Sequence, residues 1–69
     1  MKTYHLTPDE DDWELFVEGS QRPLAIFETK SGAIAHSVGL VAERKGFLAI
    51  HRENGTIEAE HSYADSSEL

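Results

Sequence analysis

The sequence predicts an α+β fold, in which a single small domain forms an antiparallel sheet of four to five short strands with one helix packed on one face. The expected order is strand, strand, short strand, helix, strand, strand. Three observations predict it: short segments alternate between apolar and polar residues, one longer segment repeats with helical spacing, and Asn54-Gly55 separates the last two alternating segments. The length of 69 residues allows one domain and not two.

Three strands are expected before the helix. Residues 3–7 and 13–18 alternate, and the acid-rich segment 8–12 between them is expected to turn the chain. A loop over residues 19–23 leads to the brief apolar run 24–27, which is short enough to be a third strand. Across the sheet, the side chains expected to meet the helix are Tyr4, Leu6, Trp13, Leu15, Val17, Leu48 and Ile50.

The helix is expected over residues 30–45. Thr29 is a good N-cap, because its hydroxyl can accept a hydrogen bond from a free backbone N–H of the first turn. Arg44 and Lys45 suit the negative end of a helix, and Gly46 can take the left-handed position that ends it. The stripe expected to face the sheet consists of Ala33, Ile34, Ser37, Val38, Leu40, Val41 and the stem of Lys45.

Residues 47–52 and 56–63 are the expected closing hairpin. Asn54-Gly55 supplies both positive-φ positions of a two-residue type I′ turn, which would pair Glu53 with Thr56. Stepping outward from that turn gives the expected register. The pairs facing the helix are Ile50 with Ala59 and Leu48 with His61, and those on the other face are His51 with Glu58, Ala49 with Glu60 and Phe47 with Ser62.

Composition bounds both the organisation and the setting. Residues 1–63 are expected to form the domain, and residues 64–69 a flexible acidic tail. The chain has no cysteine, which excludes disulfides and thiolate sites and favours a reducing, cytoplasmic location. Its longest apolar runs fall far short of the ~20 residues of a membrane span. With 13 acidic and 6 basic side chains the net charge is −7, so binding to nucleic acid or to an anionic membrane is not expected.

No motif for catalysis, a metal or a cofactor is present. The four histidines His5, His36, His51 and His61 lack the close spacing of a zinc site, and the closing-hairpin register puts His51 and His61 on opposite faces. The acidic run lacks the alternating ligands and the glycine of a calcium-binding loop. No serine has a base placed by a motif. We therefore expect no enzyme activity, no catalytic residues, no metal site and no cofactor.

An ordered set of residues extends along most of the chain: Tyr4 with Leu6, Trp13, Gly19, Ala25, Phe27, Thr29-Lys30, Ala33-Ile34, Gly46, Leu48-Ala49-Ile50-His51, Asn54-Gly55, Ile57 and Ser62-Tyr63. This set resembles a small bacterial family known only as domain of unknown function 2188. The resemblance covers about residues 3–63. It implies the fold described above and, because the family has no assigned activity, no catalytic residues. Two features depart from the family's pattern: Gly32 stands where members usually carry an acid, and the net charge is more negative.

The face of the sheet away from the helix motivates the first functional hypothesis. Large apolar side chains on an uncovered face suggest burial against another chain. The hypothesis is a non-catalytic module that binds a protein partner or a second copy of itself as a homodimer, through this face or an exposed strand edge. Its contact residues would be Phe16, Phe47 and Ala49 at the centre, with Glu14, Glu18, Glu58 and Glu60 around them.

Two alternatives to this hypothesis remain open. In the first, the protein is an acidic inhibitor or DNA mimic, from a phage or mobile element, that occupies a basic nucleic-acid-binding surface. In the second, single-stranded nucleic acid stacks on Phe16 and Phe47, although the chain lacks a basic groove for its backbone. The acidic patch of the first alternative consists of Asp9, Glu10, Asp11, Asp12 and Glu14.

Overall fold

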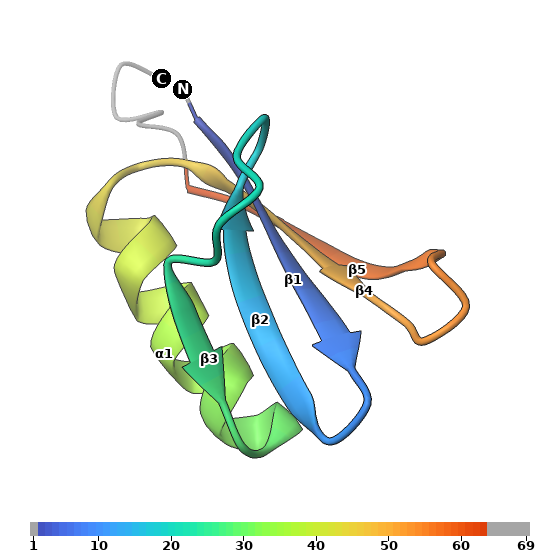
Figure 1. Ribbon diagram of the computed structural model, residues 1–69. Helices are drawn as coiled ribbons and strands as arrows, with labels where there is room; N and C mark the ends of the chain where they lie inside the picture. Colours follow the sequence, from blue (N-terminus) through green and yellow to red (C-terminus); the bar gives the residue numbers. More distant parts are fainter. Residues whose placement is uncertain (1, 64–69) are drawn as a thin grey trace.

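A computed structural model, which describes residues 2–63, shows a five-stranded sheet with one helix lying on one of its faces (Figure 1). The tail that is expected over residues 64–69 lies outside the described residues. The spatial order of the strands is β3-β2-β1-β4-β5. The elements in chain order are β1 (Thr3–Asp9), β2 (Asp12–Val17), β3 (Ala25–Phe27), α1 (Lys30–Glu43), β4 (Phe47–His51) and β5 (Ile57–Ser62). This confirms the predicted fold class and element order.

The sheet is mixed, which corrects the expectation of a purely antiparallel one. β1 and β4 are neighbours and run parallel, while the other three pairs are antiparallel. The physical reason is the connection between them. Hairpins place β1 against β2 and β4 against β5 through short turns. β1 and β4 are instead joined through β2, β3 and α1, and a crossover containing a helix suits parallel strands. The parallel pair therefore sits at the centre of the sheet.

The core lies between α1 and the face of the sheet that carries Tyr4 and Leu6. Opposite residues in the register share a face, so Leu15 of β2 and Leu48 and Ile50 of β4 join them. All five are buried, together with Ala33 and Val41 of α1. The packing confirms the predicted core side. Of the other predicted members, Ser37 is buried and Lys45 is exposed. The rest are partly buried and pack around the core: Trp13, Val17, Ile34, Val38 and Leu40.

Both ends of α1 show why the helix has its observed length. The hydroxyl of Thr29 accepts a hydrogen bond from the backbone N–H of Gly32 at 3.1 Å, as the N-cap prediction requires. The helix ends at Glu43 rather than at residue 45, and Lys45, not Gly46, takes the positive φ, 56°. Gly46 instead permits a close approach, because a Cβ there would lie 2.8 Å from the carbonyl oxygen of Lys2. No helix within residues 2–63 has the length and apolar character that crossing a membrane requires.

The closing hairpin differs from prediction at its tip. The N–H of Gly55 donates to the carbonyl of Arg52 at 2.9 Å, and the N–H of Arg52 donates to the carbonyl of Thr56 at 2.7 Å. The loop therefore has three residues, 53–55, and only Gly55 has a positive φ, so the predicted type I′ turn is wrong. A β-bulge between Ile50 and His51 then restores the predicted register for the four pairs from Phe47 to Ile50.

Candidate functional site

The candidate site is the face of the sheet opposite α1, which no element within residues 2–63 covers (Figure 1). Alternation along each strand and the pairing between strands decide which side chains point to it. We call this surface the helix-free face. It consists of Thr3, His5, Thr7, Glu14, Phe16, Ile26, Phe47, Ala49, His51, Ile57, Glu60 and Ser62.

The three apolar residues that the sequence hypothesis placed at the centre lie on this face, but they differ in access. Phe16 and Phe47 are half-buried, so part of each ring faces outward. Ala49 is only 2% exposed. It lies between His5 on β1 and Glu60 on β5, whose longer side chains flank its methyl group. Ala49 therefore cannot offer contact area to a partner, which corrects that part of the hypothesis.

Two isoleucines that the sequence analysis did not assign to the site are the most exposed apolar residues of the helix-free face. Ile26 on β3 pairs with Glu14 and is 58% exposed, and Ile57 on β5 pairs with His51 and is 44% exposed. They lie on the two edge strands, with the phenylalanines between them. Simple alternation along β5 would have placed Ile57 toward the helix. The β-bulge shifts the register by one residue, so Ile57 points to the helix-free face instead.

The same bulge moves Glu58 off the face where prediction put it. Glu58 was expected opposite His51, but Ile57 takes that place and Glu58 is the extra residue of the bulge. Its carboxylate instead accepts hydrogen bonds from Lys30 Nζ at 2.8 and 2.9 Å, on the side of the helix. The acids that remain around the helix-free face are Glu14, Glu18 and Glu60.

A chain of polar contacts crosses the middle of the helix-free face. Nε2 of His5 lies 2.9 Å from Oε1 of Glu18, and Nδ1 of His5 lies 3.0 Å from Nε2 of His51. Nδ1 of His51 in turn lies 3.2 Å from the carbonyl oxygen of Gly55. The parallel pairing of β1 with β4 brings the two rings together, with centroids 5.2 Å apart. The sequence patterns did not predict this pair, because they do not establish that β1 and β4 are neighbours.

The other two histidines belong elsewhere. His36 on α1 stacks on Phe27, and His61 stacks on Tyr63. Among residues 2–63, no group of three or more histidine or carboxylate side chains is placed to hold a metal ion.

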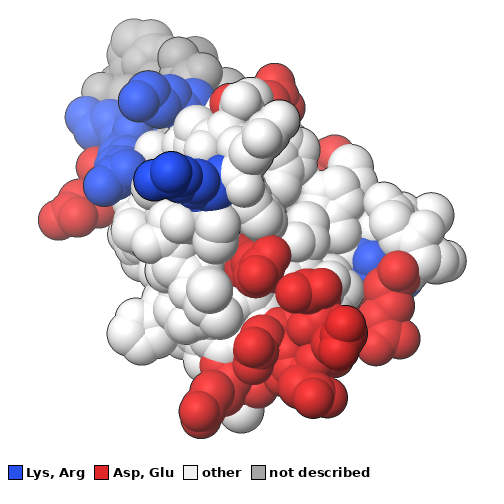
Figure 2. Space-filling view, in the orientation of Figure 1, with Lys and Arg blue, Asp and Glu red and all other residues white. Residues whose placement is uncertain are grey.

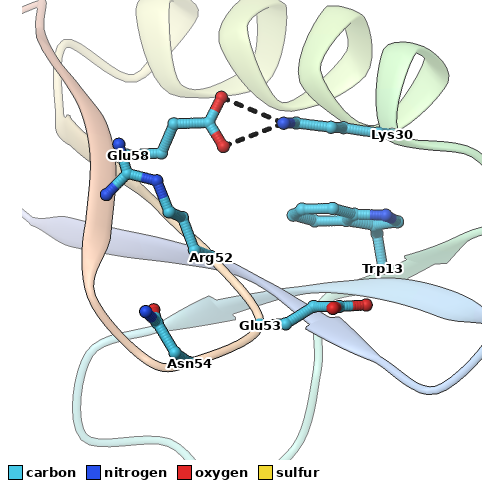
Figure 3. A pocket seen from close by; sticks show the side chains of 6 residues that line it. All are labelled: Trp13, Lys30, Arg52, Glu53, Asn54 and Glu58. Atoms are coloured by element: carbon cyan, nitrogen blue, oxygen red, sulfur yellow. Dashed lines mark hydrogen bonds and ion pairs between the residues drawn. The ribbon is translucent and has the colours of Figure 1, made fainter.

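An open cleft lies on the opposite side, between the start of α1 and the tip of the closing hairpin (Figure 3). Its volume is about 430 Å³. The indole of Trp13 lies 5.7 Å from Lys30 Nζ, which also bonds Glu58. That hydrogen bond, aided by the charges of Lys30 and Arg52, lowers the pKa of Glu58 against a smaller opposing effect of desolvation. The cleft is thus lined by two cations, Lys30 and Arg52, and by two anions, Glu53 and Glu58. The charged side chains that line it therefore add up to no net charge.

The predicted acidic patch is gathered at one end of the molecule. Asp9, Glu10, Asp11 and Asp12 are exposed around the β1–β2 turn, and Glu14 is half-buried next to them. Figure 2 shows acidic side chains concentrated at this end and basic side chains at the other. The positive φ of Glu10, 51°, marks the tight turn that brings the acids together. The patch is therefore continuous in space as well as in sequence.

Comparison with known proteins agrees with the resemblance seen in the sequence. The model of the family described as "Uncharacterized protein conserved in bacteria (DUF2188)" matches residues 4–63, which confirms that expectation. No curated protein and no solved structure matches the chain.

Proposed function

The chain belongs to the DUF2188 family of bacterial proteins, and from that premise and the surface of its sheet we propose that it is a non-catalytic protein-binding module. The helix-free face is the binding surface. Its partner is a protein whose contact area is apolar at the centre and basic at the rim. A cysteine-free chain of this kind suits the cytoplasm.

The observation that carries the proposal is the apolar area on a sheet face without cover. Ile26 and Ile57 are strongly exposed, and Phe16 and Phe47 are partly exposed between them. Several apolar side chains exposed on one uncovered sheet face favour burial against another chain, since exposing them to water costs free energy. Both edge strands contribute, so a partner that lies flat on the sheet would contact all four side chains.

Charge favours a different protein over a second copy. The chain carries a net charge of −7, and Glu14, Glu18 and Glu60 surround the apolar centre. Two copies meeting through this face would bring these acids together, whereas a basic rim would be attracted to them. Self-association is therefore the alternative outcome, and sedimentation of the chain detects it.

The test is a set of exposed-residue variants in a capture experiment on the full chain. Ile26→Ser and Ile57→Ser should reduce recovery of the partner from the source cell at least about tenfold, because the few side chains that dominate an interface cost about 2 kcal/mol or more each when truncated, and these two are the most exposed apolar side chains of the face. Phe16→Ser and Phe47→Ser should act in the same direction. Ala35→Ser, on the exposed side of α1, is the control and should leave capture unchanged.

Two results would contradict the proposal. Capture that is indifferent to all four substitutions would remove the helix-free face from consideration. Sedimentation that shows a dimer in the unsubstituted chain, and a monomer in the Ile26→Ser and Ile57→Ser variants, would replace the heterologous partner by a second copy.

A second candidate function comes from the acidic patch at the β1–β2 turn. Four exposed acids in succession could occupy a basic nucleic-acid-binding surface, as a DNA mimic does. Salt discriminates the two functions. A complex held by the acidic patch should dissociate steeply as sodium chloride rises, whereas one held mainly by the isoleucines and phenylalanines should lose only the smaller contribution of its charged rim.

A further inference from the structure

The contacts of His5 and His51 decide where each ring carries its proton. Glu18 offers His5 a carboxylate oxygen at 2.9 Å, and Gly55 offers His51 a carbonyl oxygen at 3.2 Å. Both oxygens are acceptors only. Each contact is a hydrogen bond only if the ring donates, which puts a proton on Nε2 of His5 and on Nδ1 of His51.

The inner nitrogens then face one another without a proton. A neutral imidazole has one N–H and one lone pair. Since the outer nitrogens hold the protons, Nδ1 of His5 and Nε2 of His51 both present lone pairs across 3.0 Å. Two lone pairs at that distance repel unless a cation binds both. The geometry therefore describes two electron-pair donors that face one another and need a positive charge between them.

We propose that His5 and His51 bind a divalent transition-metal ion of the kind that prefers imidazole, with copper and zinc as its representatives. Metal–nitrogen bonds of about 2.0–2.1 Å place two ligands of one ion about 3–3.5 Å apart, and the observed 3.0 Å lies at the short end of that range. The ring centroids are 5.2 Å apart, so the two lone pairs face one another nearly head-on, and a small rotation of the rings is needed to turn both toward one ion. The outer contacts are those that metal-binding histidines usually make, to a carboxylate and to a backbone carbonyl, which orient the rings and select the tautomer.

The surroundings support the same occupant. The two histidines lie on hydrogen-bonded neighbouring strands at the centre of the sheet, so their backbones hold them in place before an ion arrives. Glu18 and Glu60 are nearby, and the net charge of −7 raises the local concentration of cations. Two protein ligands leave coordination positions open to water. The site does not depend on the proposed partner, and it exists in the chain alone.

The test is titration of the full chain with copper sulfate and, separately, with zinc chloride. Calorimetry should show one ion per chain, with copper bound more tightly than zinc. In NMR spectra, copper should first broaden the ring signals of His5 and His51. This readout uses the unsubstituted protein, so it does not depend on whether a variant folds.

Substitutions give the second measurement, with the other two histidines as matched controls. His5→Gln and His51→Gln should each weaken copper binding by at least about tenfold, and Glu18→Gln by less, because an amide oxygen still accepts the hydrogen bond. His36→Gln and His61→Gln should leave binding unchanged. Circular dichroism establishes that each variant is folded.

Three outcomes would overturn the proposal. One is copper that broadens His36 or His61 first. Another is binding that survives both His5→Gln and His51→Gln. The third is that His5 and His51 share a proton at low pH but bind neither copper nor zinc. The proton would then be the only cation that the site accepts. Failure of the partner-capture experiment would leave these measurements unaffected.

Discussion

Gly46 is a residue at which even the addition of a single methyl group should disturb the fold. A Cβ there would lie 2.8 Å from the carbonyl oxygen of Lys2 and 2.9 Å from the ring of Tyr4. That carbonyl accepts the N–H of Phe47 at 2.9 Å, a contact between the starts of β1 and β4. Neither neighbour is the free end of a flexible side chain. The glycine is therefore required by space and not by its backbone angles.

We expect Gly46→Ala to lower the free energy of unfolding by about 1–3 kcal/mol, the usual cost of forcing an extra group into a packed site. Gly39→Ala is the matched control. No atom lies within 4 Å of the position of its added Cβ, and in the exposed interior of α1 alanine should stabilise the fold by up to about 1 kcal/mol. Urea denaturation measures both, and equal effects of the two substitutions would contradict the role assigned to Gly46.

Among the elements, the β4–β5 hairpin shows how one extra residue changes a surface. The three-residue loop shifts the pairing by one position, and the bulge shifts it back. Between these two irregularities Ile57 turns to the helix-free face and Glu58 turns to Lys30. Glu58 and Glu60 also place charge on β5, an edge strand, which disfavours pairing of that edge with another chain. This is the reason to assign binding to the face and not to the edge.

The contact between α1 and β5 predicts a pH dependence. The pKa of Glu58 is lowered in the folded protein, chiefly by its hydrogen bond to Lys30. A lowered pKa means that the contact stabilises the fold above the ordinary carboxyl value of 4.5 and that this stabilisation is lost as the pH falls through the lower, folded value. Glu58→Gln should therefore be less stable than the unsubstituted protein at pH 7 and equally stable near pH 2. Thermal midpoints of both proteins across this range give the measurement, and a constant difference would contradict the assignment.

Sequence patterns predicted each element because each depends on neighbours along the chain. Alternation located β1 and β2, and the spacing from Ala33 to Val41 located α1. What they missed depends on contacts across the chain. The histidine pair requires β1 beside β4, and nothing local to His5 or His51 specifies that. Asn54-Gly55 favours a two-residue turn, yet Asn54 Oδ1 accepts from the N–H and hydroxyl of Thr56 at 3.0 and 2.7 Å, within the observed three-residue loop. The exposure of Ile57 follows from that loop.

At the scale of the whole molecule, charge is separated along the sheet. The acids of the β1–β2 turn gather at one end, and basic side chains lie at the other (Figure 2). Asp9, Asp11 and Asp12 carry like charges that repel one another, and folding keeps them close because the turn is tight and pairs Asp9 with Asp12. This repulsion therefore lowers the free energy of unfolding, independently of how the core is packed. Salt should reduce that repulsion, since ions screen exposed charges beyond about 10 Å at 0.1 M.

This separation predicts how the molecule responds to salt and to loss of one charge. Raising sodium chloride from 10 mM to 500 mM should increase the free energy of unfolding, and Asp11→Asn should raise it at low salt by about 0.2–1 kcal/mol, the range measured for exposed charge interactions. Glu58→Gln removes the same charge and is the control. It should destabilise, because Glu58 bonds Lys30 whereas Asp11 has no ion pair among residues 2–63. If both substitutions stabilise equally, net charge alone governs stability, and the clustering at the turn has no separate effect.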